Sequence, residues 1–214
     1  EHMLGLEEME IGGDHAEVQG IRKSSWSQYV TLTHRYAKVK LRDVTGLAVL
    51  LAQAPILGLA MWVVFPDPDP ATMFMLALSA MWFGASASVR ELISERTIWR
   101  REARVGLGTL PYLASKVTVL GLLVTFQCVV LATMNFVMLG MWEFGFDPFL
   151  LCAITSLTGL VGMSMGLLMS SIFASSEAAV GTLPLLIIPQ ITFGGLIVKI
   201  KEMGVAAKAM SYLM

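Results

Sequence analysis

The sequence predicts an all-α membrane protein built as a polytopic helical bundle, and three observations support this fold class. First, 56% of the 214 residues are hydrophobic and only 14% are charged, with a mean hydropathy of +0.70. Second, five apolar segments are each about as long as the roughly 20 residues that a helix needs to cross a bilayer. Third, none of these segments holds a charged side chain well inside it. Because unpaired backbone amides are costly in hydrocarbon, such segments fold as helices.

Residues 1–23 are interpreted as an acidic, flexible linker, with a tag remnant as one interpretation of its first residues. A signal peptide needs a basic start before its apolar run. The first 20 residues instead lack Lys and Arg and contain six acidic side chains, which are Glu1, Glu7, Glu8, Glu10, Asp14 and Glu17. The remaining residues, 24–214, are predicted to form one transmembrane domain.

Residues 26–43 predict an amphipathic helix that precedes the first span. At about 100° per residue, aromatic and apolar side chains gather in one arc and basic side chains in another. The first arc holds Tyr29, Leu32, Tyr36 and Val39, and the second holds Arg35, Lys38 and Arg42. Aromatic rings and long cations suit a helix that lies in the cytoplasmic membrane interface. The alternative is an ordinary basic flank of the first span.

The five predicted spans cover residues 47–65, 71–88, 117–141, 149–173 and 178–197. Six Lys or Arg precede the first span and six lie between the second and third, whereas the loops 65–70 and 143–148 contain none. By the positive-inside rule, the N-terminus and the loop after the second span are cytoplasmic, in a protein of the cell inner (plasma) membrane. Three Lys after the fifth span would lie outside and do not fit this orientation, but the other 12 of the 15 basic residues do. The odd number of spans suggests a fragment.

The stretch RELISERTIWRRE, residues 90–102, predicts a cytoplasmic helix that continues to Arg104. Its charges separate into two faces, with Leu92, Trp99 and Ala103 between them. One face holds Glu91, Glu95 and Glu102, and the other holds Arg96, Arg100 and Arg104. One charged face would contact lipid headgroups or the bundle, and the other would contact a partner. The glutamate face is the one interpreted as the docking surface. Positive-inside retention alone, the simpler interpretation, explains the arginines but not three in-phase glutamates.

The fourth span contains GLVGMSMGLLMSS, in which Gly159, Gly162 and Gly166 predict close packing against another helix. The letters GMSMG also match the hydrolase G-x-S-x-G pattern, but no strand-turn-helix context surrounds them and the three histidines lie in the N-terminal region. Cys128 and Cys152 fall in different apolar runs and show no metal-ligand spacing. No catalytic residue and no metal site is therefore predicted.

The fifth span holds Pro184, Pro189 and the pair Gly194 and Gly195. Proline leaves a carbonyl unpaired, so this helix is predicted to be kinked or broken and packed against protein. Such a helix either lines a substrate path or simply bends.

Polar side chains within the spans are uncharged, which argues against a proton- or ion-coupled transporter. The sequence also lacks a G-x-x-x-x-G-K-[ST] loop, so energy would come from a partner. A Met- and Leu-rich interior suits a hydrophobic or amphipathic substrate. The candidate path residues are Gln53, Gln127, Asn135 and Phe193.

These features together resemble the permease domain of ABC type-2 transporters, in particular the G-type (White-like, ABCG-like) half-transporters. The resemblance runs from about residue 27 to residue 214. In SERTIWRREARVGLGTLPYLASK the matching positions are Glu95, Arg96, Trp99, Arg101, Glu102, Tyr112 and Lys116. A second block, SSEAAVGTLPLLIIPQITFGGLIV, resembles the intracellular turn and the Pro-containing fifth helix of the family. Bacterial members in which a forkhead-associated domain precedes an ATPase and the permease resemble the chain best.

The resemblance implies the membrane half of an ATP-driven exporter that works by alternating access. Its 90–104 helix would dock on a nucleotide-binding domain through Glu91, Glu95, Arg96, Trp99, Arg100, Arg101 and Glu102, with Glu177 as a second contact. ATP and Mg²⁺ would bind on that domain, where ATPase activity is expected, and not on this segment. The other implied partners are a second permease half, in a homodimer, and membrane lipid, with no nucleic acid. The chain departs from the family in lacking an ATPase domain and the sixth span.

A membrane anchor or signalling scaffold, which recruits a cytoplasmic partner without transport, is the alternative function. A membrane enzyme has little support because no span offers paired carboxylates, a metal cluster, or a nucleophile beside a base.

Overall fold

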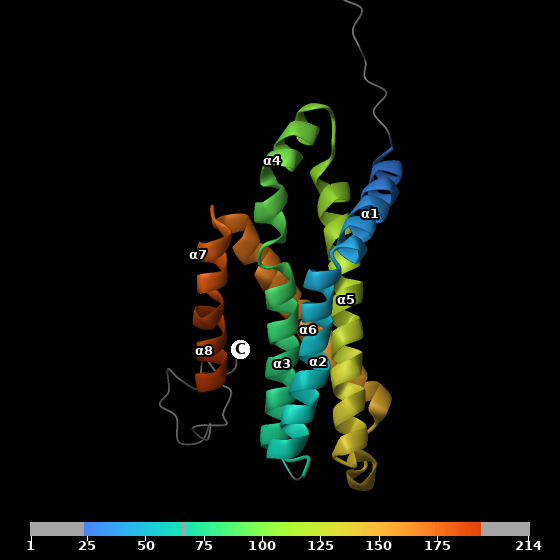
Figure 1. Ribbon diagram of the computed structural model, residues 1–214, viewed down its shortest axis with the longest axis vertical. Coiled ribbons are helices and arrows are strands. Elements are labelled where there is room, and N and C mark those ends of the chain that lie inside the picture. The colour runs from blue at the N-terminus through green and yellow to red at the C-terminus, as the bar shows by residue number, and fades with distance from the viewer. Residues whose placement is uncertain (1–23, 66, 194–214) are drawn as a thin grey trace, which may run out of the picture.

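The computed structural model describes residues 24–65 and 67–193, and within these ranges the chain is helical and contains no strand. Helices α2, α3 and α5 run side by side along the long axis, and α6 packs against α3 and α5 (Figure 1). The α-helices are α1 (Ser25–Arg42), α2 (Val44–Val64), α3 (Pro70–Ser88), α4 (Glu91–Arg104), α5 (Thr109–Met138), α6 (Pro148–Ile172), α7 (Ser176–Gly181) and α8 (Leu183–Phe193). A 3-10 helix, η1 (Met141–Phe144), follows α5. The predicted all-helical membrane bundle is confirmed for these residues.

Capping residues in the sequence explain where the helices begin. The carboxylates of Asp43, Asp69 and Asp147 accept backbone N–H groups in the first turns of α2, α3 and α6. Pro70 and Pro148 occupy the first helical position, where proline costs no hydrogen bond. The two Asp-Pro loops of the sequence are thus helix starts.

Four helices are long and apolar enough to cross a membrane, and they correspond to the first four predicted spans: α2, α3, α5 and α6. Helix α5 begins at Thr109 rather than at residue 117 and has 30 residues. At about 1.5 Å per residue it is longer than the roughly 30 Å hydrocarbon layer. One end of α5 therefore extends past the spans.

The fifth predicted span is broken in the structure, as its prolines predict. Helix α7 ends at Gly181, Thr182 follows, and α8 starts at Leu183 with Pro184 in its first turn. Four of the five predicted spans are span-length helices within the described residues, and α7 and α8 hold the described part of the fifth. Residues 194–197 of the prediction, including Gly194 and Gly195, lie outside the described residues, as does the linker 1–23.

Helices α3 and α6 make the closest contact in the bundle. A Cβ atom added to Gly84 would lie 1.9 Å from the carbonyl oxygen of Gly159, and one added to Gly162 would lie 2.2 Å from that of Met81. A Cβ on Gly166 would lie 2.1 Å from Ser88 Oγ. Gly162 and Gly166 of the fourth predicted span therefore face α3, where any side chain would separate the two backbones, whereas a Cβ on Gly159 would first meet Cys128 Sγ of α5, at 2.5 Å.

One end of the bundle carries α1, α4 and the start of α5, and we call it the basic end. Every Lys and Arg of the described residues lies on these three helices or at Arg90, directly before α4. Helix α1 leans along α5 and does not cross the spans at a right angle (Figure 1). Leu32 and Tyr36 of its predicted apolar arc are buried, and the Tyr29 hydroxyl lies 3.0 Å from Thr118 Oγ1. Tyr29, Leu32 and Tyr36 of this arc thus contact protein, Val39 is exposed, and the interfacial position of the helix stays a prediction.

Candidate functional site

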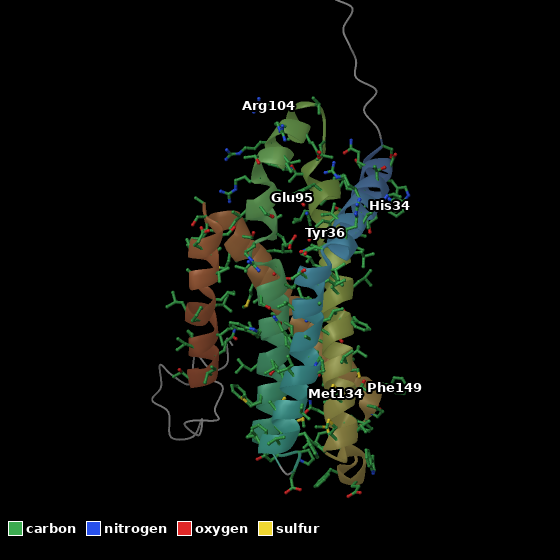
Figure 2. All side chains as sticks on the ribbon, viewed as in Figure 1. His34, Tyr36, Glu95, Arg104, Met134 and Phe149 are labelled. Carbon is green, nitrogen blue, oxygen red and sulfur yellow. The ribbon has the colours of Figure 1, made fainter. Side chains whose placement is uncertain are left out.

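The basic end holds a cluster of charged and aromatic side chains from three helices, which we call the charged junction. Helix α4 places Glu91 in its first turn and Arg101 and Arg104 in its last, which complements the helix dipole. Figure 2 shows Tyr36 and Glu95 near each other, with Arg104 further out on α4. The charged junction consists of Arg35, Tyr36 and Lys40 from α1, Glu91, Glu95 and Glu102 from α4, and Tyr112 and Lys116 from α5.

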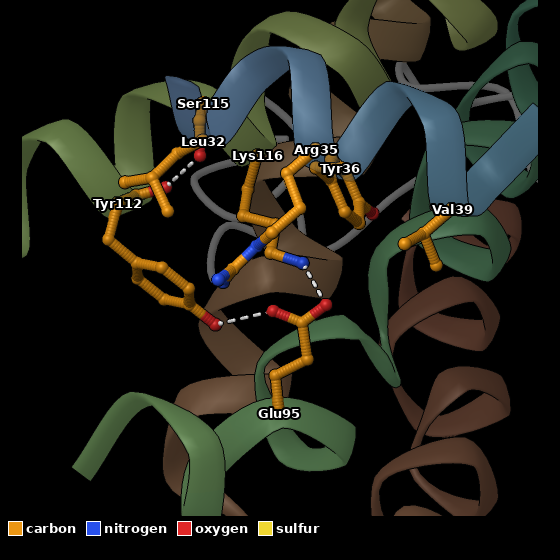
Figure 3. A pocket seen from close by; sticks show the side chains of 8 residues that line it. All are labelled: Leu32, Arg35, Tyr36, Val39, Glu95, Tyr112, Ser115 and Lys116. Atoms are coloured by element: carbon orange, nitrogen blue, oxygen red, sulfur yellow. Dashed lines mark hydrogen bonds and ion pairs between the residues drawn. The ribbon is translucent and has the colours of Figure 1, made fainter. Parts of the chain in front are cut away.

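Glu95 and Lys116 form the buried centre of the charged junction (Figure 3). Lys116 Nζ lies 2.6 Å from Glu95 Oε1, and the Tyr112 hydroxyl donates to Glu95 Oε2 at 3.3 Å. The same Nζ lies 3.4 Å from the centroid of the Tyr36 ring. The Lys116 side chain is only 2% exposed. A carboxylate and an aromatic face therefore offset part of the hydration that this ammonium has lost.

Glu91 joins the start of α4 to α1 through two donors. Its Oε2 accepts from the Tyr36 hydroxyl and its Oε1 from the Lys40 ammonium. Burial raises the pKa of Tyr36 far above its usual value, and the negative charge of Glu91 acts in the same direction. Tyr36 therefore stays protonated and remains a hydrogen-bond donor at neutral pH.

Glu102 and Arg35 form the outermost pair of the charged junction. The Arg35 guanidinium donates to both carboxylate oxygens, at 2.8 and 3.1 Å. This hydrogen bonding raises the pKa of Arg35 above its ordinary value. The Arg35 side chain is 51% exposed, so the pair adds geometric specificity more than stability.

The opposite side of α4 is joined to the end of α6. Ser170 Oγ accepts from the backbone N–H groups of Leu92 at 2.9 Å and Ile93 at 3.2 Å, two donors that a helix start leaves unpaired. Arg96 Nη2 in turn donates to three carbonyl oxygens at the end of α6: Phe173 at 2.7 Å, Ser171 at 3.2 Å and Ser170 at 3.4 Å. Helix α4 is therefore held by α1 and α5 on one side and by α6 on the other.

The remaining face of α4 points away from the bundle. Its exposed residues recur at helical spacing and are Ser94, Thr97, Ile98, Arg100, Arg101 and Arg104. A shallow depression in this face is lined by Ile98, Arg101, Glu102 and Val105. Glu177, the predicted second contact, is exposed on α7. This outer face of α4 is basic, with one apolar residue in its middle.

The glutamate face of α4, predicted as a docking surface, makes contacts within the chain, and its docking role stays a prediction. Glu91, Glu95 and Glu102 are bound by cations and tyrosines of their own chain. Trp99 also faces inward, with its ring centroid 6.3 Å from that of Tyr112. On the arginine face, Arg96 binds carbonyl oxygens at the end of α6. Arg100 and Arg104, together with the neighbouring Arg101, are exposed and can contact a partner.

The predicted path residues lie away from the charged junction. Gln127 and Asn135 are buried in α5; the Gln127 amide donates to the carbonyl of Leu50, and the Asn135 amide donates to that of Leu131 at 2.9 Å. Gln53 on α2 is half-buried. The side-chain oxygens of Gln53, Gln127 and Asn135 are each buried without a hydrogen-bond partner in the described structure. Phe193 ends α8, and its side chain lies outside the described residues.

Sequence reasoning missed the partners of the glutamates and the role of Ser170. Glu91, Glu95 and Glu102 share one face of α4, and each pairs with one cation of another helix, Lys40, Lys116 and Arg35 respectively. One local signal for these partners was present in the sequence, because Tyr36 and Lys40 are four residues apart and therefore share one face of their helix.

Within the described residues no group of three His, Cys, Asp or Glu could hold a metal ion.

The geometry defines a class of protein, namely a helical membrane domain in which a charged junction fixes a protruding helix to one end of the spans. Residues 27–214 match the family described as ABC-2 type transporter. The chain therefore belongs to the ABC-2 type transporter family and is its membrane domain, as the resemblance predicts. The G-type subclass stays a prediction.

The chain is also similar to a curated protein that combines two activities in its name. It is 29% identical over 195 residues to the ABC transporter ATP-binding/permease protein Rv1747 of Mycobacterium tuberculosis (strain ATCC 25618 / H37Rv). The match covers 80% of this chain and 22% of that protein. The chain thus spans about a fifth of the length of this relative. No solved structure matches the chain.

Proposed function

We propose that the chain is the transmembrane half of an ATP-driven exporter of the G-type, in which α4 transmits the movement of a nucleotide-binding domain to the bundle. The observation that carries this proposal is the double attachment of α4. The charged junction binds it to α1 and α5, and Ser170 and Arg96 bind it to α6. A helix joined to three others passes a displacement on to all of them.

The outer face of α4 is the proposed docking surface. Arg100, Arg101 and Arg104 fit an acidic surface, and Ile98 fits an apolar pocket among those charges. Glu177 on α7 provides the proposed second contact. Glu91, Glu95, Glu102, Arg96 and Trp99 act in this proposal by holding α4 in place.

The remaining parts of the proposal follow the predictions from sequence. ATP and Mg²⁺ bind on the nucleotide-binding domain, and two permease halves, as a homodimer, form one alternating-access path. The ATP-binding part in the name of the mycobacterial relative supports such a partner domain. The basic end faces the cytoplasm of a cell whose plasma membrane holds the bundle. The substrate is hydrophobic or amphipathic, with Gln53, Gln127, Asn135 and Phe193 as path residues.

The test is a double charge reversal on the outer face of α4, Arg100→Glu with Arg101→Glu. We expect the affinity for the nucleotide-binding domain to fall by about tenfold or more, because two attractive pairs become repulsive. Lys38→Glu, an exposed charge on α1, is the matched control and should keep wild-type affinity. Unchanged affinity in the double variant would show that the docking surface lies elsewhere.

A transport assay in proteoliposomes separates the exporter from the alternative scaffold. Both the permease and its nucleotide-binding domain are reconstituted, and ATP-dependent movement of amphiphilic dyes is followed. Docking without movement of any amphiphile, and without stimulated ATP hydrolysis, would favour the membrane anchor or signalling scaffold.

A further inference from the structure

A cavity of about 110 Å³ lies beside the charged junction, where the chain passes from α1 into α2. It is lined by the corner between α1 and α2, the end of α3, the start of α4 and the middle of α5. Its charged lining consists of Lys40, Asp43, Arg90 and Glu91, and its apolar lining includes Leu47, Leu50 and Leu123. A cavity that is charged in one part and apolar in another fits an amphipathic ligand.

Two of the four charged groups are free to bind a ligand. Lys40 and Glu91 are paired with each other, but Arg90 makes no ion pair or side-chain hydrogen bond within residues 24–65 and 67–193. Asp43 accepts one backbone N–H, from Gly46 to Oδ1 at 3.0 Å, and its Oδ2 remains available. The cavity thus offers one unpaired cation from the start of α4 and one carboxylate oxygen from the start of α2.

The order of these groups along the chain matches the layers of a membrane. Asp43 directly precedes the α2 span, and Arg90 lies two residues after the end of α3. Leu47 and Leu50 follow Asp43 by four and seven residues, which is about 6 and 10 Å further along a helix. Charge at the headgroup level thus gives way to leucine at the level where acyl chains begin.

We propose that this cavity binds a phospholipid whose headgroup carries a primary amine, as in phosphatidylethanolamine. The lipid phosphate pairs with the Arg90 guanidinium, and its ammonium donates to the Asp43 carboxylate. The first acyl carbons contact Leu47, Leu50 and Leu123. A lipid with only negative charge leaves the Asp43 carboxylate without a partner and is repelled by it, and a trimethylammonium headgroup has no N–H to donate.

The test uses the purified chain and three lipids that share the same acyl chains. Native mass spectrometry measures retention of phosphatidylethanolamine, phosphatidylcholine and phosphatidylglycerol, and we expect about a tenfold preference for the first. Asp43→Asn keeps the helix cap but removes the charge, and it should abolish this preference. Arg90→Gln should weaken retention of all three lipids about tenfold. Arg42→Gln, an exposed cation at the end of α1, is the control and should retain the wild-type pattern.

Equal retention of the three lipids by the wild-type chain would overturn the proposal, as would an Asp43→Asn variant that keeps the preference. Soluble phosphoethanolamine, which has the same charges but no acyl chain, is added as a competitor. Effective competition at equal concentration would show that the acyl chains contribute nothing and would overturn the lipid assignment. Leu47→Trp fills the apolar part of the cavity and should reduce lipid retention, with circular dichroism to confirm that the variant is folded.

Discussion

Lys116 is the residue at which most contacts of the charged junction meet. Its ammonium touches Glu95 of α4 and the Tyr36 ring of α1, while its own backbone belongs to α5. A lysine with a 2% exposed side chain has lost nearly all of its water, and this cost is offset only if both partners stay in place. One side chain therefore fixes the relative positions of three helices.

The variant Lys116→Met should lower the free energy of unfolding by about 2–4 kcal/mol, because the partly buried Glu95 carboxylate loses its cation and Tyr36 loses the ammonium on its ring. The unfolding midpoint in detergent measures this loss. Lys38→Met removes an exposed lysine and should change stability by less than about 0.5 kcal/mol. The double variant Lys116→Met with Glu95→Gln should recover part of the loss, because no uncompensated charge remains. Equal losses for the variants at positions 116 and 38 would contradict the buried pair.

At the scale of elements, α4 is a short helix that depends on its neighbours. None of its 14 residues is fully buried, although Leu92 and Ile93 pack partly buried against the core. Hydrogen bonds and ion pairs to α1, α5 and α6 add to this packing. Among these, Arg96 contributes the bonds to the end of α6, directly before α7.

Removing the Arg96 guanidinium should loosen α4 from α6 without changing the spans. In Arg96→Ala the carbonyls of Ser171 and Phe173 lose a charged donor, a loss of about 1.5–3 kcal/mol. Amide hydrogen exchange in residues 91–105 and 172–181 should then become about tenfold faster or more. Exchange in α5 should be unchanged. Arg100→Ala is the matched control, and equal acceleration by both variants would show that the bonds of Arg96 do not hold the helix.

The sequence predicts α4 better than it predicts the contacts of α4. Hydropathy and helical period are local properties, so the first four spans and the shared face of Glu91, Glu95 and Glu102 follow from the sequence. The sequence does not show that this glutamate face points toward the bundle, because the cations that bind it lie 21 to 67 residues away along the chain. The aromatic arc of α1 shows the same limit, since one pattern suits either lipid or the buried surface of α5. Ser170 gave no local signal because a serine at a helix end has many uses.

At the scale of the whole molecule, the contact between α3 and α6 determines how the basic end is positioned. Helix α4 follows α3 directly and is bound by Ser170 and Arg96 to the end of α6. Glycines on both helices allow the backbones to approach closely enough for the Ser88 hydroxyl to donate to the Met163 carbonyl at 2.9 Å. A change in the distance between α3 and α6 must therefore move both attachments of α4.

The variant Gly162→Ala tests this dependence. Its new Cβ would lie 2.2 Å from the carbonyl oxygen of Met81, so the two backbones must separate. We expect an unfolding free energy lower by about 1–3 kcal/mol, the usual cost of overpacking. Gly181→Ala is the control, because its Cβ would meet no atom within 4 Å. Since the ends of α3 and α6 both hold α4, the separation should also speed hydrogen exchange in residues 91–105. Lower stability with unchanged exchange there would show that α4 is positioned by the charged junction alone.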